Sequence, residues 1–166
     1  MTAKQILTGA EIDQALDGPG ADLLAYWRAH ASATGLATKA DMDPSDFPKA
    51  LPGVQIVECV PPPDRFRYRL VGTREVAVRG FDPTGRPVAE GYFGSSEKVV
   101  LSNYQTVVDR AEPICIRDIF RKVNGVPVAD VSLFLPLLDA AGALTVVMVY
   151  SFQEAVDADH PIWGGA

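Results

Sequence analysis

The dipeptide Asn124-Gly125 constrains the fold of this chain more than any other feature of the sequence. It separates two apolar, β-branched segments, residues 114–123 and 126–138, and Asn-Gly between such segments is the strongest short-range signal for a two-residue type I′ hairpin. A third segment, residues 143–152, follows a turn predicted at 139–142 and is apolar at successive positions, so both of its faces should be covered. The last third of the chain therefore predicts three antiparallel strands, the third of them inside the sheet.

Two further strands are predicted upstream, at residues 54–60 and 65–72, and the second alternates strictly between apolar residues and arginines. Between them and the hairpin, residues 97–110 carry apolar side chains at helical spacing and are followed by Pro113. The order of two strands, a helical middle and three strands predicts an α+β domain. Its core would be a five-stranded antiparallel sheet with the helices on one face.

The first third of the chain predicts a helical extension. A capping-box pattern, Thr8 followed by Glu11, starts a short helix, and a second helix follows Gly20. Residues 39–53 hold three prolines and several aspartates, which predicts an extended polar connector to the core.

Composition indicates a single globular domain with appendages: 166 residues, of which 48% are hydrophobic and 22% charged. We divide the chain into an N-terminal extension at 1–53, a core at 54–154 and a tail at 155–166. The net charge of −6 argues against nucleic acid or an anionic membrane as the main partner. Neither a bilayer-spanning segment nor a signal peptide is predicted, so we expect a cytoplasmic protein.

Several short motifs occur in a fixed order: Trp27, Asp41-Met42-Asp43-Pro44, Tyr68-Arg69-Leu70-Val71-Gly72-Thr73, Gly80-Phe81-Asp82 and Thr84-Gly85-Arg86. In this order they resemble the PAS domains, and more narrowly a small proteobacterial PAS-like family. The resemblance implies strand order 2-1-5-4-3, with residues 143–152 at the centre. It also implies a non-catalytic sensory module of bacterial signalling that binds a small molecule or a signalling protein partner and associates with itself.

Two other functions remain open from the sequence. A small α+β cone enzyme of the isomerase or hydratase type would use Asp130 and Tyr104 as acid and base. Asp130 lies in an apolar strand, where burial would raise its pKa, although a solvent-facing position is the commoner arrangement for a strand carboxylate. The other alternative is a scaffold that binds no ligand, with a filled core and an exposed apolar patch.

The sequence favours no cofactor. A photoactive flavin domain needs a reactive cysteine on the helices around the pocket, whereas Cys59 and Cys115 fall in predicted strands. A haem domain needs an axial histidine in the helical middle, whereas His30 and His160 lie in the N-terminal helix and the tail. The cysteine spacing matches neither a zinc site nor a disulfide framework.

Within the PAS-like fold, the inward side chains of strands and helix should surround any ligand pocket, unless they simply fill the core. The predicted lining would suit a small, largely apolar ligand and consists of Phe66, Tyr68, Leu70, Leu101, Tyr104, Val108, Leu133, Leu135, Val146, Met148 and Tyr150. Six arginines lie between residues 65 and 86; they form either a solvated surface or an anion-binding one, for which Arg79 and Arg86 are the candidates.

Homodimerisation is the last expectation. Leu23, Leu24 and Trp27 form an apolar helix face, and Val147 and Val149 would form an apolar outer face on the central strand. These two surfaces would pair between two copies of the chain, or within one chain if the helix folds back. Ile162 and Trp163 would pack nearby.

Overall fold

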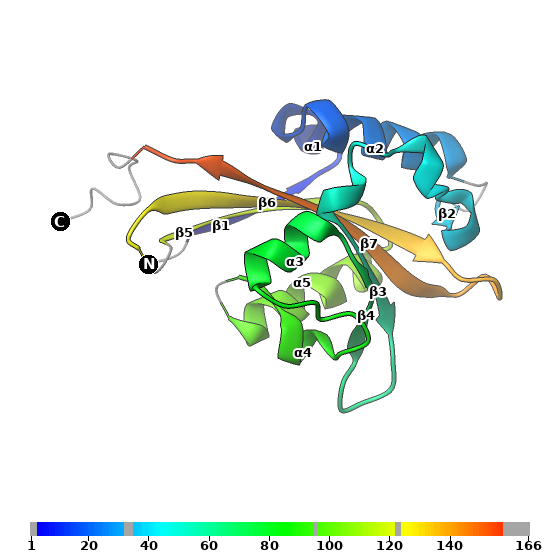
Figure 1. Ribbon diagram of the computed structural model, residues 1–166. Coiled ribbons are helices and arrows are strands. Elements are labelled where there is room, and N and C mark those ends of the chain that lie inside the picture. Colours follow the sequence, from blue (N-terminus) through cyan, green and yellow to red (C-terminus); the bar gives the residue numbers. More distant parts are fainter. Residues whose placement is uncertain (1–2, 32–34, 95, 122–123, 158–166) are drawn as a thin grey trace.

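A computed structural model describes residues 3–31, 35–94, 96–121 and 124–157 of the chain. Its centre is one twisted sheet with helices on both faces (Figure 1). The core strands are β3 (Val54–Cys59), β4 (Phe66–Val71), β5 (Ile114–Arg121), β6 (Pro127–Leu138) and β7 (Leu144–Ala155). They pair antiparallel in the spatial order β5-β6-β7-β3-β4, which confirms the predicted order 2-1-5-4-3 with β7 at its centre.

Two strands that the sequence did not predict extend this sheet. β1 (Ala3–Thr8) pairs antiparallel with β5 at the sheet edge, and the two-residue β2 (Ala37–Thr38) pairs parallel with β6. β1 mixes polar and apolar residues, as an edge strand can, and so lacks the pattern of a buried strand. Both strands come from the predicted N-terminal extension, which is therefore built into the sheet.

The helices form two layers on opposite faces of the sheet (Figure 1). α1 (Ala10–Ala15) and α2 (Gly18–His30) lie on one face, which we call the α2 face. The other, which we call the α5 face, carries α3 (Thr73–Arg79), α4 (Val88–Gly91) and α5 (Glu97–Arg110). α5 has the predicted bounds, and Ser96 caps it by accepting a hydrogen bond from the Val99 amide. None of the helices in the described part of the chain has the length and apolarity to cross a membrane.

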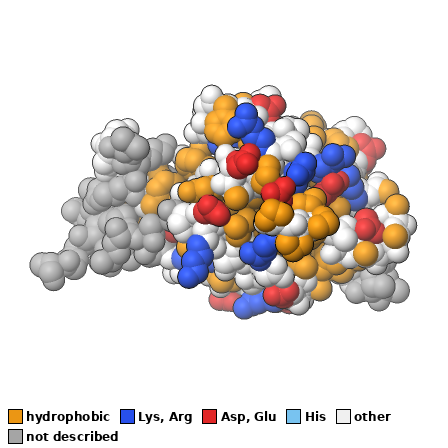
Figure 2. All heavy atoms as spheres, turned by 90° about the horizontal axis from the view of Figure 1, so that it is seen from below, with side chains coloured by type: hydrophobic (Ala, Val, Ile, Leu, Met, Phe, Trp, Pro, Cys, Tyr) orange, Lys and Arg blue, Asp and Glu red, His pale blue; other side chains and the backbone are white. Residues whose placement is uncertain are grey.

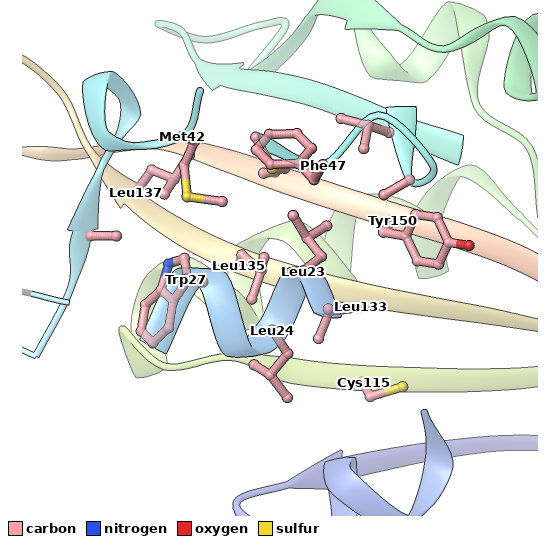
Figure 3. Close-up of a cluster of buried hydrophobic side chains, with 14 of the residues drawn as sticks. Leu23, Leu24, Trp27, Met42, Phe47, Cys115, Leu133, Leu135, Leu137 and Tyr150 are labelled. Atoms are coloured by element: carbon pink, nitrogen blue, oxygen red, sulfur yellow. The ribbon is translucent and has the colours of Figure 1, made fainter. Parts of the chain in front are cut away.

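The predicted extended connector is wrong. Residues 39–53 instead fold into three short 3-10 turns, Lys39–Asp41, Pro44–Asp46 and Leu51–Gly53. Proline suits the first positions of such a turn because its φ is already helical and its missing N–H leaves no hydrogen bond unmade. Between the turns, Met42 and Phe47 are buried against the α2 face (Figure 3).

A dry apolar cluster fills the space between α2 and the sheet. Figure 3 shows Leu23, Leu24 and Trp27 of α2 turned toward the leucines of β6. Leu23, Leu24 and Trp27 are 0%, 1% and 4% exposed, and the Trp27 indole Nε1 donates a hydrogen bond to the Pro136 carbonyl oxygen at 3.0 Å. The N-terminal helix thus covers its own sheet.

This burial overturns the predicted dimer interface. The three α2 residues are already covered within the chain, and Val147 and Val149 are buried under α5 on the opposite face. Residues that one chain buries so completely have no surface left for a partner. The other predicted contributors, Ile162 and Trp163, lie outside the described residues.

The predicted facing of β6 and β7 is also wrong. Five residues predicted to line the pocket point to the α2 face instead, namely Leu133, Leu135, Val146, Met148 and Tyr150. Val147 and Val149 point to the α5 face, where the pocket was expected. Both faces of these strands are largely apolar. Their sequence pattern therefore shows which residues share a face, but not which of the two helical layers covers that face.

A bulge in β4 explains why Leu70 does not face the cavity as predicted. Tyr68 pairs with Val57 but Leu70 pairs with Ile56, so Arg69 is an extra residue between them. The extra residue turns Leu70 away from the α5 face, and Leu70 is 40% exposed. It therefore cannot line a pocket with Phe66 and Tyr68, as strict alternation predicted.

Candidate functional site

A small cavity lies between α3, α5 and the sheet, on the α5 face. About 50 Å³ of it is open to the centres of water-sized molecules, enough for a few waters or a very small ligand. The walls combine apolar side chains with a ring of polar ones: Gln55, Tyr68, Glu75, Arg79, Asn103, Tyr104, Asp118, Asp130, Ser132 and Ser151. The predicted apolar lining is therefore wrong in character.

Of the residues predicted to line the pocket, Tyr68 and Tyr104 do so. Phe66, Leu101 and Val108 belong to the same apolar cluster under α5 but lie behind the cavity wall. The aromatic rings pack on one another, with the Tyr104 centroid 5.4 Å from those of Phe66 and Phe134.

An ion pair within α3 forms one wall of the cavity. Glu75 and Arg79 are one helical turn apart, and Arg79 Nη1 lies 3.2 Å from Glu75 Oε2. Both side chains are buried, 3% exposed for Arg79 and 7% for Glu75. Burial raises the pKa of Glu75 despite the opposing effect of Arg79.

Arg79 uses its whole guanidinium group within the protein. Nε donates to the Gly91 carbonyl oxygen at 2.7 Å, and Nη1 donates to both the carbonyl and the carboxylate of Glu75. Nη2 donates to Gln55 Oε1 at 3.0 Å and to the Tyr68 hydroxyl at 3.3 Å. These bonds use all five N–H donors of the Arg79 side chain. Arg79 therefore has a structural role, and the predicted contact with an anion is wrong.

Arg86 lies outside the cavity. It is exposed, with its guanidinium carbon 5.5 Å from the centroid of the Phe81 ring. The structure therefore does not bring the two predicted anion-binding arginines together. Arg67 and Arg69 face acidic neighbours instead, Asp64 at 2.8 Å and Glu58 at 3.2 Å.

A chain of hydrogen bonds crosses the sheet from this ion pair. Gln55 Nε2 donates to Glu75 Oε2 at 3.4 Å and to Ser151 Oγ at 3.3 Å. The hydroxyls of Ser151 and Ser132 lie 2.8 Å apart, and Ser132 Oγ donates to Asp130 Oδ2 at 3.4 Å. The polar network thus runs from α3 through β3 and β7 to β6.

Asp130 ends this chain. Burial is the main cause that raises its pKa to about 7, and the negative charge of Glu75 adds to it. Asp118 lies directly opposite Asp130 in the β5–β6 register, and Lys4 lies opposite Asp118 in the β1–β5 register. Asp130 is thus a cavity-facing group, the rarer of the two arrangements that the sequence left open.

Sequence reasoning missed most of the polar wall. Glu75, Gln55, Asn103, Asp118, Ser132 and Ser151 were not predicted as site residues. Two signals could have found some of them: the i,i+4 spacing of Glu75 and Arg79, and the i,i+2 spacing of Asp130 and Ser132 within an otherwise apolar strand. The second signal marks the strand face that lines the cavity.

The described residues fit neither a flavin adduct nor a haem. Cys59 is half-buried at the end of β3, and Cys115 is buried on the α2 face, where burial raises the pKa of its thiol to about 12. A cavity of about 50 Å³ is also far below the roughly 300–1,000 Å³ of pockets for ligands of that size. His30 is exposed on α2, and His160 lies outside the described residues.

Metal binding finds no support in the part of the chain that the structure describes, where no cluster of three or more His, Cys, Asp or Glu side chains could hold an ion.

Solved structures with the same fold include several light-oxygen-voltage domains. One, studied with a flavin analogue, is 12% identical, and the alignment covers 70% of this chain and 85% of that one with a TM-score of 0.50. An RNA-binding light-oxygen-voltage receptor is 14% identical over 92% of this chain and 39% of its own, with a TM-score of 0.49. At such identities the likeness shows the fold alone.

Sequence comparison gives the family. No curated protein matches the chain. A family model described as "PAS domain" matches residues 17–149, which include α2, the 3-10 turns and most of the sheet. With the antiparallel sheet and the strand order already described, this match shows that the chain belongs to the PAS domain family.

Proposed function

We propose that this PAS domain is a sensory module whose cavity on the α5 face binds a very small polar molecule. PAS domains are generally sensory, non-catalytic modules, which supports the first half of the proposal. In this proposal the domain acts in bacterial cytoplasmic signalling and passes its state to a partner protein or to a second copy of itself.

One observation supports the proposal that the ligand is polar. A buried ion pair and a chain of hydrogen bonds face an internal space on the α5 face. Burying polar groups costs free energy unless they are paired, and a fully apolar core would be simpler to fold. Polar groups gathered around a space favour a polar occupant, so the predicted apolar ligand is replaced by a polar one.

A nuclear magnetic resonance titration tests the proposal. Amide shifts would be followed with methylammonium, guanidinium, urea, ethylene glycol and acetate at millimolar concentration. We expect at least one compound to give saturable shifts at cavity-lining residues such as Ser132, Asn103 and Ser151. Ser132→Val, which places two methyl groups in the cavity, should weaken binding while the rest of the spectrum stays folded. If no compound shifts the lining residues, the cavity is not a ligand site.

The structure places the two residues of the enzyme alternative together but makes one of them a poor acid. Asp130 and Tyr104 do line the same cavity. However, burial raises the pKa of Tyr104 well above its usual value, so its phenol gives up a proton even less readily than in water. Together with the family, this favours a binding role for both residues.

Self-association remains a prediction whose interface must lie on another surface. Static light scattering would give a mass near 17.8 kDa for a monomer and twice that for a dimer. We expect Trp27→Glu to unfold the chain, because the Trp27 indole is buried between α2 and the sheet. If Trp27 lay in a dimer interface instead, the variant would be a folded monomer. Only the net charge of −6 argues against a nucleic-acid partner.

A further inference from the structure

The charges around the cavity fall into pairs, with one carboxyl group left over. Glu75 is paired with Arg79, and Lys4 lies opposite Asp118. Burial lowers the pKa of Lys4, and the negative charge of Asp118 partly offsets that effect. Lys4 Nζ also donates to the Asn103 side chain at the cavity wall. Asp130 is the carboxyl group that remains, so the site is neutral when Asp130 is protonated and carries one negative charge when it is ionised.

The hydrogen-bond donors of Arg79 and Gln55 are used within the wall. Arg79 donates to Gly91, Glu75, Gln55 and Tyr68, and Gln55 donates to Glu75 and Ser151. An anion would therefore have to break existing bonds to find a donor. By contrast, the Asp130 carboxyl group accepts from Ser132 at 3.4 Å, a long bond, and a carboxylate offers about four lone-pair sites. Asp130 therefore has acceptor capacity that a hydrogen-bond-donating ligand can use.

Asp130 also has access to solvent. A surface cleft of about 300 Å³ lies beside α3, lined by Arg74, Glu75, Val78, Asp130, Phe152 and Gln153. Glu75 and Asp130 line both the cleft and the cavity. Asp130 therefore borders the cleft as well as the cavity, so a proton leaving its carboxyl group can reach water in the cleft.

We propose that the cavity binds a small hydrogen-bond-donating cation of the ammonium, amine or guanidinium class at Asp130, in exchange for the proton of its carboxyl group, which passes to bulk water. This inference rests on the proposed function and names its ligand class. A cation with N–H groups supplies both the charge and the donors that the ionised Asp130 would otherwise lack. The cavity volume limits such a cation to a few heavy atoms.

The surrounding groups support a proton exchange near neutral pH. Glu75 and Arg79 face Asp130 from α3, Asp118 from β5, and Tyr104 lies across the cavity on α5. Burial and the charges of Glu75 and Asp118 raise the pKa of Asp130 to about 7, whereas Arg79 and the Ser132 hydroxyl lower it. The carboxyl group therefore changes charge in the pH range where a cation would compete with its proton.

Titrations with methylammonium and guanidinium chloride at pH 6 and pH 8 test the proposal. Tetramethylammonium chloride, which has no N–H donor, and sodium acetate serve as probes of matched ionic strength. We expect the two N–H cations to bind about 10-fold more tightly at pH 8 than at pH 6, since protonated Asp130 has to lose its proton first. Calorimetry in two buffers of different ionisation enthalpy should show release of nearly one proton at pH 6 and about a tenth of one at pH 8.

Two variants complete the experiment. Asp130→Asn should abolish the pH dependence and weaken cation binding at pH 8 at least 10-fold, whereas Asp22→Asn, which removes the same charge from the exposed side of α2, should change neither. The pH dependence of the unaltered protein gives the answer even if Asp130→Asn folds poorly. Binding of acetate in preference to the cations would overturn the ligand class and leave the proposed function standing. Cation binding without proton release would overturn the exchange at Asp130. Binding of urea or ethylene glycol but of neither cation would overturn the ligand class, and no binding by any compound of either set would overturn the proposed function itself.

Discussion

The two faces of the central sheet are built on opposite principles. On the α2 face, leucines, Trp27 and the thiol of Cys115 pack into a dry cluster (Figure 3). On the α5 face, a smaller apolar cluster surrounds the Glu75–Arg79 ion pair and a cavity. Burial of apolar area contributes stability, whereas buried ion pairs are often neutral or costly. The comparison teaches that α1 and α2 cover the apolar side of the sheet, whereas α3 and α5 enclose the polar site.

The same strands serve both faces by alternation. In β7, Tyr150 belongs to the α2 cluster and the next residue, Ser151, belongs to the polar chain. Arg74 of α3 joins the two layers, because it donates to the Ser151 carbonyl oxygen and its guanidinium carbon lies 5.5 Å from the Tyr150 ring centroid. A change at the cavity can therefore reach the α2 layer through a short covalent and packed path.

The outer surface over α3, α4 and α5 is mixed. Figure 2 shows Lys and Arg side chains interspersed with Asp and Glu and with apolar groups on this face. Val78, Phe81 and Tyr92 are exposed large hydrophobic residues of the α3–α4 region. Oppositely charged residues among them limit the long-range electrostatic field of this face.

The largest effect should come from breaking the ion pair on the α5 face. Arg79→Met leaves Glu75 buried without its partner, and we expect the free energy of unfolding to fall by about 3–5 kcal/mol, measured by urea denaturation. The double variant Glu75→Leu/Arg79→Met should recover most of this loss. Arg28→Met, which removes the exposed pair with Asp13, should change the free energy of unfolding far less, because solvent screens an exposed pair. Equal losses for Arg79→Met and Arg28→Met would contradict the difference between buried and exposed pairs.

A cavity made on the α2 face should have a nearly equal cost. Leu23→Ala shortens a side chain that is 0% exposed between α2 and the sheet. We expect the free energy of unfolding to fall by about 2–5 kcal/mol, again measured by urea denaturation. The matched control is Leu70→Ala at a position 40% exposed, with an expected loss below about 1 kcal/mol. A loss for Leu23→Ala as small as that of the control would mean that α2 does not stabilise the sheet.

Asp130 should make stability depend on pH in the opposite direction to a salt-bridged aspartate. Its folded pKa of about 7 is raised above the ordinary 3.8, so between these values the folded state holds a proton that the unfolded state lacks. The free energy of unfolding should then fall by up to about 1.4 kcal/mol per pH unit as pH rises toward 7, and this contribution should level off above it.

Denaturation series from pH 5.5 to 8 would measure this slope, away from the isoelectric point near 4.8. Asp130→Asn should flatten the profile, whereas Asp22→Asn should keep the slope of the unaltered protein. A profile for Asp130→Asn that parallels the unaltered one would assign the pH dependence to other groups, of which Glu75 is the first to examine, because burial raises its pKa as well.

The smallest effect should come from the middle of the polar chain. Ser151→Ala removes the hydroxyl that lies between Gln55 and Ser132, and we expect a loss of about 1 kcal/mol. Ser102→Ala, at an exposed position of α5, should change stability by less than about 0.5 kcal/mol. No difference between the two variants would mean that the polar chain does not couple β3 to β6.

Local signals predicted the elements of the core. The apolar positions and flanking residues of α5 gave its bounds correctly. Asn124-Gly125 lies in the connection of the β5–β6 hairpin, with Gly125 at φ +82°. The predicted two-residue turn is wrong, because such a turn would place Arg121 opposite Val128, whereas Arg121 pairs with Pro127. The PAS resemblance supplied the strand order. The proline-rich connector was predicted wrongly because proline is compatible with both an extended chain and the first residue of a 3-10 turn.

The sequence by itself determined which residues of β6 and β7 alternate, that a hairpin joins β5 to β6, and where α5 begins and ends, because these depend on neighbours along the chain. Only the tertiary structure decided which face of the sheet each alternating set occupies. An apolar side chain gains the same free energy under either helical layer. The identity of Leu133 or Val149 therefore does not show which face of the sheet the residue occupies. Polar groups do differ between an apolar cluster and a cavity. Yet Gln55, Ser151, Ser132 and Asp130 form one network with Glu75 of α3 only when β3, β7 and β6 pair side by side.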